Sequence, residues 1–405
     1  MAQSRELVVL ASLRANVRAD GKVRITRKFL DGMQRYADRW PGPVTAILHP
    51  EAAAQSGNLD DVIVDHADLG FDLRVIPFDS PELLRAIESA SVVQGGGDFR
   101  LNHLPAFCKR KDIPYVFVSE YTLRTRKQII KAETPDPVRR LRRYVWAWNQ
   151  ERSNRSGVAL SAGVQCNGIP TFKEYQPLNR NTLLYFDSRI SADMLPAKPR
   201  LIERTREYSK GRPIRLAFSG RLNRMKGADD LLLVAAHLRA LNVPFVLDIC
   251  GDGDLMPALR NEIERGGLAA FVRARGVLDF ESELVPFMRD EIDLFVCCHR
   301  QGDPSCTYVE TFACGVPIVG YDNEAFVGLL GSCAAGWHTP MGDPRALAQM
   351  IAKLREAPER LVDAAIRGLE FARQHTADAT FEARARHMLE LSRAERSTAL
   401  AAARA

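Results

Sequence analysis

The sequence predicts an α/β protein made of two doubly wound, Rossmann-like domains with parallel sheets. Short apolar runs alternate with segments of helical periodicity along the chain, which is the pattern of strands joined by helical crossovers. Thirteen strand-like runs are too many for one sheet of ordinary size, and 405 residues exceed the usual length of one domain. A polar, proline-bearing stretch at residues 196–213 marks the natural point of division.

The expected elements follow from their residues in order. Apolar runs predict strands at 7–13, 44–48, 73–76, 91–94, 113–118, 158–161, 182–185, 214–219, 245–250, 271–275, 293–298, 316–320 and 335–338. Helical spacing predicts helices at 25–39, 81–87, 101–109, 229–241, 254–265, 281–290, 307–314 and 343–355. The carboxyl ends of parallel strands meet at one edge of a sheet, where open α/β folds bind ligands.

The same order predicts the domain boundaries. We expect a first domain at 1–195, a linker at 196–213 and a second domain at 214–375. The last segment, 376–405, is expected to form a helix and tail that pack back toward the first domain. No internal repeat or long low-complexity tract interrupts this organisation.

Composition narrows the class of protein. The net charge of +6 is modest for this length and does not require a nucleic-acid partner. The eight cysteines form no C-x-x-C pair, so they are expected to be reduced, buried thiols, and the group around Cys297, Cys298 and Cys306 lacks the spacing of a metal site. The apolar run at 7–13 is too short for a signal peptide or a membrane span, which favours a cytoplasmic protein.

The loop after the expected strand 214–219 carries two cations. Arg221 and Lys226 lie between Gly220 and Gly227, at a turn that leads from a strand into a helix. Arg can grip a phosphate group with two hydrogen bonds, and Lys supplies a point charge. The alternative is a solvated turn with two ordinary surface cations.

Two further segments have the same kind of position. Gly251 and Gly253 follow the strand 245–250 and allow close backbone approach, although they lack the full spacing of a dinucleotide fingerprint. Downstream, a short helix is expected to begin near Ser305 or Thr307, where free N–H groups could meet a phosphate. Glu310 on that helix could accept hydrogen bonds from ribose hydroxyls, or it could form a local salt bridge.

These motifs resemble the retaining nucleotide-sugar glycosyltransferases of family 4. The resemblance covers residues 214–375 and rests on Gly-Arg-Leu before Lys-Gly, the Gly-Asp-Gly turn, and Glu-Thr-Phe-Ala-Cys-Gly-Val-Pro. It implies a GT-B fold, in which two Rossmann-like domains face each other across a cleft. It also implies that Arg221 and Lys226 hold the donor diphosphate, that Glu310 holds the ribose, and that no metal or other cofactor is required.

The chain departs from the family pattern at one position. The family has two glutamates separated by seven residues, but Gly302 stands eight positions before Glu310. The first glutamate of the family contacts hydroxyls of the donor sugar. Asp303 or Gln301, which flank Gly302, is expected to take over that role, and Asp303 is the preferred candidate.

The first half offers candidates for acceptor binding at the ends of its strands. They are Asp20 in the loop after the first strand, followed by Gly96, Gly97, Asp98, Arg100 and His103. The glycines allow a ligand to approach, and Asp98 and Arg100 could bind hydroxyls or an acidic group. Glu120 ends the strand 113–118 and could orient the acceptor hydroxyl or act as its base. Each also has a structural interpretation, as a surface loop, a helix cap or a salt-bridge partner.

A basic and aromatic segment at 139–148 could lie on an anionic membrane as a helix, with its tryptophans at the interface. The alternative is a solvated helix that buries its aromatic residues.

The leading hypothesis is a retaining hexosyltransferase of cell-surface polysaccharide or glycolipid synthesis, located in the cytoplasm or at the inner face of the membrane. Its substrates would be a nucleotide sugar and a saccharide or lipid-linked saccharide. The alternatives are an epimerase or hydrolase of similar fold, and a non-catalytic protein that binds nucleotide sugars.

Overall fold

The computed structural model describes residues 5–51 and 60–402 and divides into two compact units. The first unit combines the described parts of Met1–Leu123, Tyr144–Tyr185 and Asp378–Ala405. The second consists of Arg124–Arg143 and Phe186–Ala377. Residues 124–143 therefore belong to the second unit, although the boundaries expected from the sequence place them in the first domain at 1–195.

Within the described residues, the first unit has one sheet whose main body is parallel. Its order is β5-β3-β1-β6-β7-β8-β9, and two short antiparallel strands, β2 and β4, continue from β1. The bounds are β1 Leu7–Val17, β2 Val23–Thr26, β3 Val44–Pro50, β4 Asp61–Val64, β5 Asp72–Val75, β6 Val92–Gly95, β7 Tyr115–Ser119, β8 Gly163–Asn167 and β9 Thr182–Tyr185.

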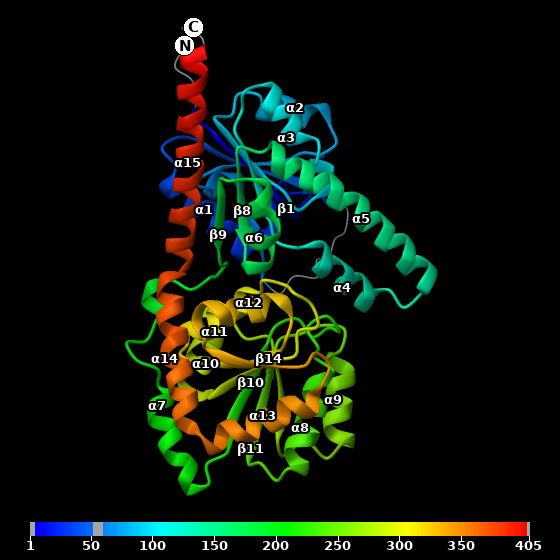
Figure 1. Ribbon diagram of the computed structural model, residues 1–405, viewed down its shortest axis with the longest axis vertical. Coiled ribbons are helices and arrows are strands. Elements are labelled where there is room, and N and C mark those ends of the chain that lie inside the picture. Colours follow the sequence, from blue (N-terminus) through cyan, green and yellow to red (C-terminus); the bar gives the residue numbers. More distant parts are fainter. Residues whose placement is uncertain (1–4, 52–59, 403–405) are drawn as a thin grey trace. The chain divides into compact units, whose positions relative to one another are not determined.

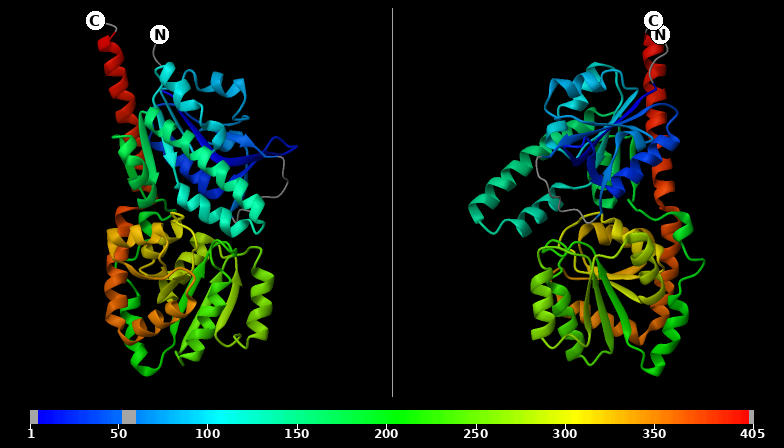
Figure 2. Two further views of the ribbon diagram at one scale, coloured as in Figure 1. Left: turned by 45° about the vertical axis from the view of Figure 1, so that its right-hand side comes forward. Right: turned by 180° about the vertical axis from the view of Figure 1, so that it is seen from behind.

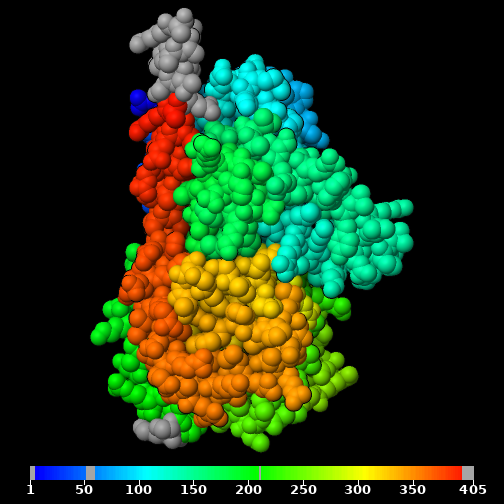
Figure 3. Space-filling view, viewed as in Figure 1, coloured from blue at the N-terminus to red at the C-terminus, as the bar shows by residue number. Residues whose placement is uncertain are grey.

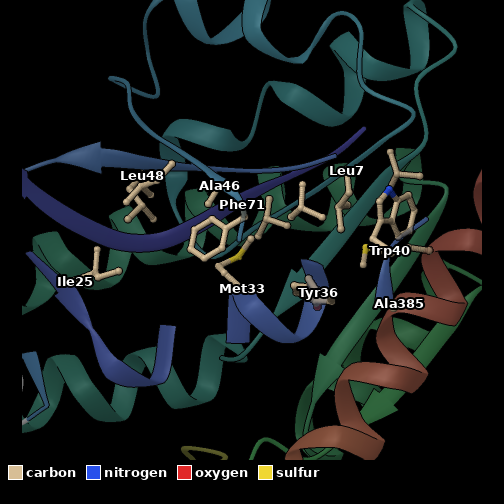
Figure 4. Close-up of a cluster of buried hydrophobic side chains, with 14 of the residues drawn as sticks. Leu7, Ile25, Met33, Tyr36, Trp40, Ala46, Leu48, Phe71 and Ala385 are labelled. Atoms are coloured by element: carbon tan, nitrogen blue, oxygen red, sulfur yellow. The ribbon is translucent and has the colours of Figure 1, made fainter. Parts of the chain in front are cut away.

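Helices cover both faces of this sheet (Figure 1). Alternate residues of β1 enter different hydrophobic clusters: Leu7 and Val9 pack with α1 and α15, while Val8 and Leu10 pack with α2, α3 and α6. Figure 4 shows Leu7 in the first cluster together with Tyr36 of α1. The helices of this unit are α1 Arg27–Arg39, α2 Pro81–Ile87, α3 Leu104–Arg110, α6 Ile169–Tyr175, α15 Ala377–Ala402 and, from Tyr144 on, α5 Pro137–Leu160.

The helix α15 forms part of the core of the first unit. In Figure 3 its red residues lie against the green residues that follow α5. The buried Gln165 of β8 accepts a hydrogen bond from Nε of Arg384 at 2.9 Å and donates one to the Arg384 carbonyl oxygen at 3.0 Å. Gln94 of β6 donates to the Gln165 side chain at 2.8 Å, so one polar network joins two strands to this helix.

The second unit has a parallel sheet of order β12-β11-β10-β13-β14-β15 among its described residues. Figure 2 shows the ribbon of this unit from two further sides. The strands are β10 Ile214–Ser219, β11 Phe245–Cys250, β12 Val272–Gly276, β13 Leu294–Cys297, β14 Ile318–Tyr321 and β15 Gly336–Thr339. The helices are α4 Leu123–Glu133, the first turns of α5, α7 Leu201–Arg204, α8 Asp230–Ala240, α9 Met256–Arg265, α10 Val285–Glu291, α11 Cys306–Ala313, α12 Glu324–Cys333, α13 Pro344–Glu356 and α14 Pro358–Gln374.

Two strand assignments differ from the sequence-based expectation. The predicted strand at 158–161 is wrong: residues 158–160 form the end of α5, and the strand is β8 at Gly163–Asn167. This strand was not predicted because Gln165 and Asn167 are polar and interrupt its apolar pattern, although both are buried in the fold. The antiparallel pair β2 and β4 was also missed, because each strand has only four residues. The other twelve predicted strands overlap observed ones.

Candidate functional site

The loop between β10 and α8 holds its two cations in different environments. Arg221 is exposed to solvent, whereas the side chain of Lys226 is only 9% exposed. The backbone N–H of Lys226 donates to Oδ1 of Asn223 at 3.0 Å, and Gly227, with φ of +64°, leaves no room for a Cβ against the carbonyl oxygen of Cys298. The loop is therefore packed onto the end of β13, and Lys226 is directed inward.

Lys226 pairs with Asp303 in the loop after β13. Its Nζ lies 2.5 Å from Oδ2 of Asp303 and 3.5 Å from the hydroxyl oxygen of Ser305. Gln301 is buried beside them: its amide nitrogen lies 3.5 Å from the same Asp303 oxygen, and its Oε1 has no hydrogen-bond partner among the described residues. The loops after β10 and β13 thus form one polar cluster at the carboxyl edge of the sheet.

The glycines after β11 pack against the same loop. A Cβ on Gly251 would lie 1.9 Å from the carbonyl oxygen of Gly220, and a Cβ on Gly253 would lie 2.6 Å from that of Leu222. The backbone N–H of Gly220 donates to the Cys250 carbonyl at 3.1 Å. In this structure, then, these glycines let two backbone segments approach each other.

Glu310 of α11 is buried and held by an arginine. Arg189 donates from Nε to Oε1 at 2.8 Å and from Nη2 to Oε2 at 3.1 Å, in a bidentate pair. The guanidinium also lies 3.8 Å from the ring centroid of Phe280. The salt-bridge interpretation of Glu310 is therefore realised in this conformation, although its partner is distant in sequence.

The start of α11 matches the expectation from sequence in part. The helix begins at Cys306 with Ser305 as N-cap, but the Ser305 side chain makes no capping hydrogen bond. Thr307 lies in the first turn and is partly exposed.

Gly302 is in contact with α4. Its N–H donates to Oε1 of Gln128 at 2.8 Å, and the Thr125 hydroxyl lies 3.3 Å from its carbonyl oxygen. Thr125 also lies 3.1 Å from Oε1 of Glu324, the first residue of α12, and Nε of Arg124 lies 2.9 Å from Oε2 of the same carboxylate. Sequence reasoning found none of the α4 residues or Glu324, because these contacts join segments far apart in the chain.

A buried polar network supports these loops from below. Nδ1 of His299, which lies two residues after β13, is 3.2 Å from the hydroxyl oxygen of Tyr308. Asn323 donates to that oxygen and to the His299 carbonyl, each at 3.3 Å. Burial, together with the nearby charge of Lys226, holds the pKa of His299 well below its ordinary value. Burial raises the pKa of Tyr308 well above its ordinary value. Both groups are neutral, so the network serves to fix the loops in position.

The candidates in the first unit lie on loops at the carboxyl ends of its strands. Asp98 pairs with Arg100, with Nη1 at 3.1 Å and 3.2 Å from the two carboxylate oxygens, in the segment that follows β6 with Gly96 and Gly97. His49 lies near the end of β3, close enough to this pair for the charges of Arg100 and Asp98 to act on it, and it was not identified from the sequence.

The remaining three candidates of the first unit are exposed. Glu120 follows β7, His103 precedes α3 without capping it, and Asp20 accepts hydrogen bonds from Arg18 and the Lys22 N–H within its own loop.

No described group of three or more His, Cys, Asp or Glu side chains is arranged to hold a metal ion. No described helix is long and apolar enough to cross a membrane.

The comparison with known families identifies the segment that carries this site. Residues 200–369 match the model of the glycosyl transferases group 1. This range includes the loops after β10, β11 and β13 and the helices α11 and α12.

Curated relatives match over similar parts of the chain. The amylovoran biosynthesis glycosyltransferase AmsK of Erwinia amylovora is 28% identical over 156 residues, which are 37% of this chain and 38% of the relative. The 2-deoxystreptamine N-acetyl-D-glucosaminyltransferase of Streptomyces fradiae is 28% identical over 139 residues, or 34% of this chain and 32% of the relative. The matched part thus spans less than two fifths of either relative.

Solved structures match over nearly the whole chain. HepE of Anabaena, solved with UDP, has a TM-score of 0.64 at 16% identity. The matched region covers 95% of this chain and 99% of the HepE chain. WaaG, described as a glycosyltransferase involved in lipopolysaccharide biosynthesis, has a TM-score of 0.62 at 14% identity, with 94% and 99% coverage. Sucrose-phosphate synthase of Thermosynechococcus elongatus has a TM-score of 0.65 at 13% identity, with 97% and 100% coverage. The fold is that of the GT-B glycosyltransferases.

Proposed function

We propose that this protein is a glycosyltransferase that moves a hexose from a nucleoside-diphosphate sugar to a saccharide or lipid-linked saccharide. One observation carries the proposal: the residues that match the glycosyl transferases group 1 gather two cations and a buried carboxylate at the carboxyl edge of one parallel sheet. Such an edge is where open α/β folds bind nucleotides. The relatives that act in polysaccharide synthesis support a role in cell-surface polysaccharide or glycolipid synthesis.

The donor diphosphate would bind between Arg221, Lys226 and the first turn of α11. Lys226 would exchange Asp303 for a phosphate oxygen, and the backbone N–H groups near Ser305 and Thr307 would add to the positive potential. These groups stabilise the negative charge that develops on the leaving diphosphate. Because they supply the neutralising charge themselves, we propose that the reaction needs no metal ion.

The ribose would bind at Glu310. Its carboxylate is paired with Arg189 in this structure, so ribose hydroxyls would have to displace that guanidinium. The cation–π contact with Phe280 gives Arg189 a second partner, which would stabilise it after displacement. The UDP and UDP-glucose complexes of HepE support a nucleotide-sugar donor.

The acceptor would bind to the first unit, where Asp98 and Arg100 offer a paired acceptor and donor of hydrogen bonds. Asp20, His103 and the backbone of Gly96 and Gly97 remain proposed acceptor contacts. Glu120 would orient the attacking hydroxyl or take its proton. We propose attack and departure on the same face of the sugar, which retains the anomeric configuration.

The helix α5 supports a peripheral membrane contact. Val138, Leu141, Val145 and Trp148 are spaced along one helical face, and each is at least half exposed. Four arginines alternate with these residues along the same helix, at positions 139, 140, 142 and 143, and Arg143 also pairs with Glu133 at 3.4 Å. Exposed apolar residues beside cations fit the surface of an anionic bilayer, and we propose this contact at the cytoplasmic face of the membrane.

Sedimentation with vesicles tests the membrane proposal. Replacing the four arginines with Gln should weaken binding to vesicles of anionic lipid by about 1 kcal/mol per arginine at low salt. Replacing Arg260 and Arg265 of α9 with Gln provides a control for the loss of charge elsewhere. Equal sedimentation of both variants and the wild type would return α5 to the solvated-helix interpretation.

A thermal-shift screen followed by a transfer assay tests the proposed activity. UDP-, GDP-, ADP- and dTDP-sugars are each added to the full chain, and the true donor should raise the melting temperature. A ligand at a hundred times its Kd stabilises the native state by about 2.7 kcal/mol. The selected donor is then incubated with saccharide and lipid-linked acceptors. If no nucleotide sugar stabilises the protein, or if a stabilising one yields only free sugar, an epimer or no product, the proposed transfer activity is wrong.

A further inference from the structure

The space at Gly302 is filled by the carboxylate of Glu324. A Cβ built on Gly302 would lie 2.4 Å from Cγ and 2.7 Å from Oε1 of Glu324. No side chain could stand at position 302 unless that carboxylate moved. Glu324 begins α12, after the next strand β14. Its carboxylate therefore occupies the space that a side chain at position 302 would fill.

The backbone of Glu324 is anchored to the same loop. Asn323, which is fully buried, caps α12 by accepting a hydrogen bond from the Phe326 N–H at 2.9 Å. Its amide nitrogen donates to the His299 carbonyl oxygen at 3.3 Å, and His299 lies in the loop that leads from β13 to Gly302. The first turn of α12 and the loop after β13 are thus held together by a side chain that has no contact with solvent.

The carboxylate itself is held by α4. The Thr125 hydroxyl lies 3.1 Å from Oε1, and the amide nitrogen of Gln128 lies 3.3 Å from Oε2. Arg124 adds a salt bridge at 2.9 Å, although its own side chain is largely exposed. The Glu324 side chain is 16% exposed, so it is oriented but still reaches solvent.

We propose that Glu324 binds hydroxyls of the donor sugar. This inference rests on the proposed function, because it requires a diphosphate at Lys226. Glu324 touches Gly302, and the next residue, Asp303, is the partner of Lys226, so a sugar joined to that diphosphate lies within reach of Glu324. A carboxylate accepts hydrogen bonds at both oxygens and can hold two neighbouring hydroxyls.

Glu324 is better placed for this role than Asp303, the candidate that the sequence favoured. Asp303 lies 2.5 Å from the Lys226 ammonium. Once a phosphate replaces it there, Asp303 stands beside the diphosphate, whose negative charge repels it. The donors that hold Glu324 include the long Gln128 contact and the exposed Arg124, which sugar hydroxyls could replace. Thr125, which is buried, would keep the carboxylate oriented during this exchange.

The test compares Glu324→Gln with Glu359→Gln, in which the changed residue is an exposed glutamate of the first turn of α14. The probes are UDP, GDP, ADP and dTDP and their glucose conjugates, with binding followed by calorimetry and transfer by kcat/KM. A hydrogen bond to a charged group accounts for about a 10- to 100-fold effect, so Glu324→Gln should lower kcat/KM by that factor. Its affinity for the free nucleoside diphosphate should stay within about twofold of the wild type, because only the sugar contact changes.

A second pair of variants keeps the test decisive if Glu324→Gln is unstable. Glu324→Gly should lose transfer. The double variant Gly302→Glu with Glu324→Gly should recover part of it, because the new side chain at position 302 places a carboxylate in the space that Glu324 filled. A structural role alone would not produce recovery with unchanged nucleoside-diphosphate binding.

The outcomes separate this inference from the proposed function. If the wild type and Glu359→Gln transfer a sugar and Glu324→Gln does so equally well, the assignment of Glu324 is wrong and the proposed function stands. Equal losses of transfer and of nucleoside-diphosphate binding also overturn it. If the wild type binds no nucleotide sugar, the proposed function itself fails.

Discussion

Replacing Lys226 with Met separates its structural role from its proposed catalytic role. The Met side chain keeps most of the apolar stem but removes the charge that lies 2.5 Å from Asp303. Both side chains of this pair are mostly buried, at 9% and 15% exposure. Leaving one partner of a buried ion pair alone costs about 3–5 kcal/mol. The partial exposure of Asp303 places the expected loss of stability at about 3 kcal/mol.

The loss of transfer should have a different origin. A group that stabilises the charge on a leaving diphosphate contributes about 2–4 kcal/mol in the transition state, which is about a 30- to 900-fold change in kcat/KM. Adding Asp303→Asn to Lys226→Met removes the unpaired carboxylate. The double variant should therefore regain most of the lost stability, yet its transfer should stay low.

Urea denaturation measures the stability of the single and double variants, and initial rates of nucleoside-diphosphate release with acceptor present measure transfer. Lys353→Met on α13, where the lysine is exposed, serves as the matched control and should change neither quantity. If the double variant recovers transfer together with stability, Lys226 only holds Asp303 in place and the proposed role in catalysis is refuted.

Three further predictions follow from the same site. Transfer should survive excess EDTA, because protein cations supply the neutralising charge; complete loss that magnesium or manganese restores would contradict this. Arg189→Gln should lower stability by about 3 kcal/mol, because the buried Glu310 loses its bidentate ion-pair partner. Nucleoside-diphosphate affinity, measured by calorimetry, should not fall, because ribose no longer competes with a guanidinium; weaker binding would make Arg189 part of the nucleotide site. Because the pKa of His299 is lowered in the fold, the unfolded chain takes up more protons below about pH 6.5. The contribution of His299 to the free energy of unfolding is therefore present above that pH. As the pH falls, the free energy of unfolding decreases by up to about 1.4 kcal/mol per pH unit. His299→Gln should make the unfolding free energy less dependent on pH between about 6.5 and 5, and an unchanged slope in urea titrations would count against it.

Local patterns in the sequence were enough to predict most of the parallel sheets. The run Phe245–Cys250 is apolar at nearly every position and bounded by turn residues, and it forms β11 over the same span. The strand β8 could not be found in this way. Its Gln165 is polar, and hydrogen bonds with the distant Gln94 and Arg384 explain why the fold can bury it.

The candidate site shows the same limit. The positions of Lys226 and Glu310 at the ends of strands could be anticipated from spacing, because chain order sets which loops share an edge of the sheet. Their present partners, Asp303 and Arg189, are separated from them by 77 and 121 positions. Such contacts depend on packing between elements, which no local period encodes, and the contact of α4 with Gly302 belongs to the same class.

The return of α15 to the first sheet has a consequence for how the protein is made. The core around Leu7 and Met33 includes Met388 and Leu391, which leave the ribosome only after nearly two hundred residues of the second unit. At about 5–20 residues per second, synthesis of the second unit alone takes roughly ten to forty seconds, and the early strands wait at least that long for the helix. During this interval part of their apolar face has no partner, whereas the second unit is continuous from Phe186 to Ala377 apart from the α4 segment that precedes it. The half of the chain that is synthesised first is therefore the half that matures last, and nascent chains stalled before α15 should depend most on chaperones.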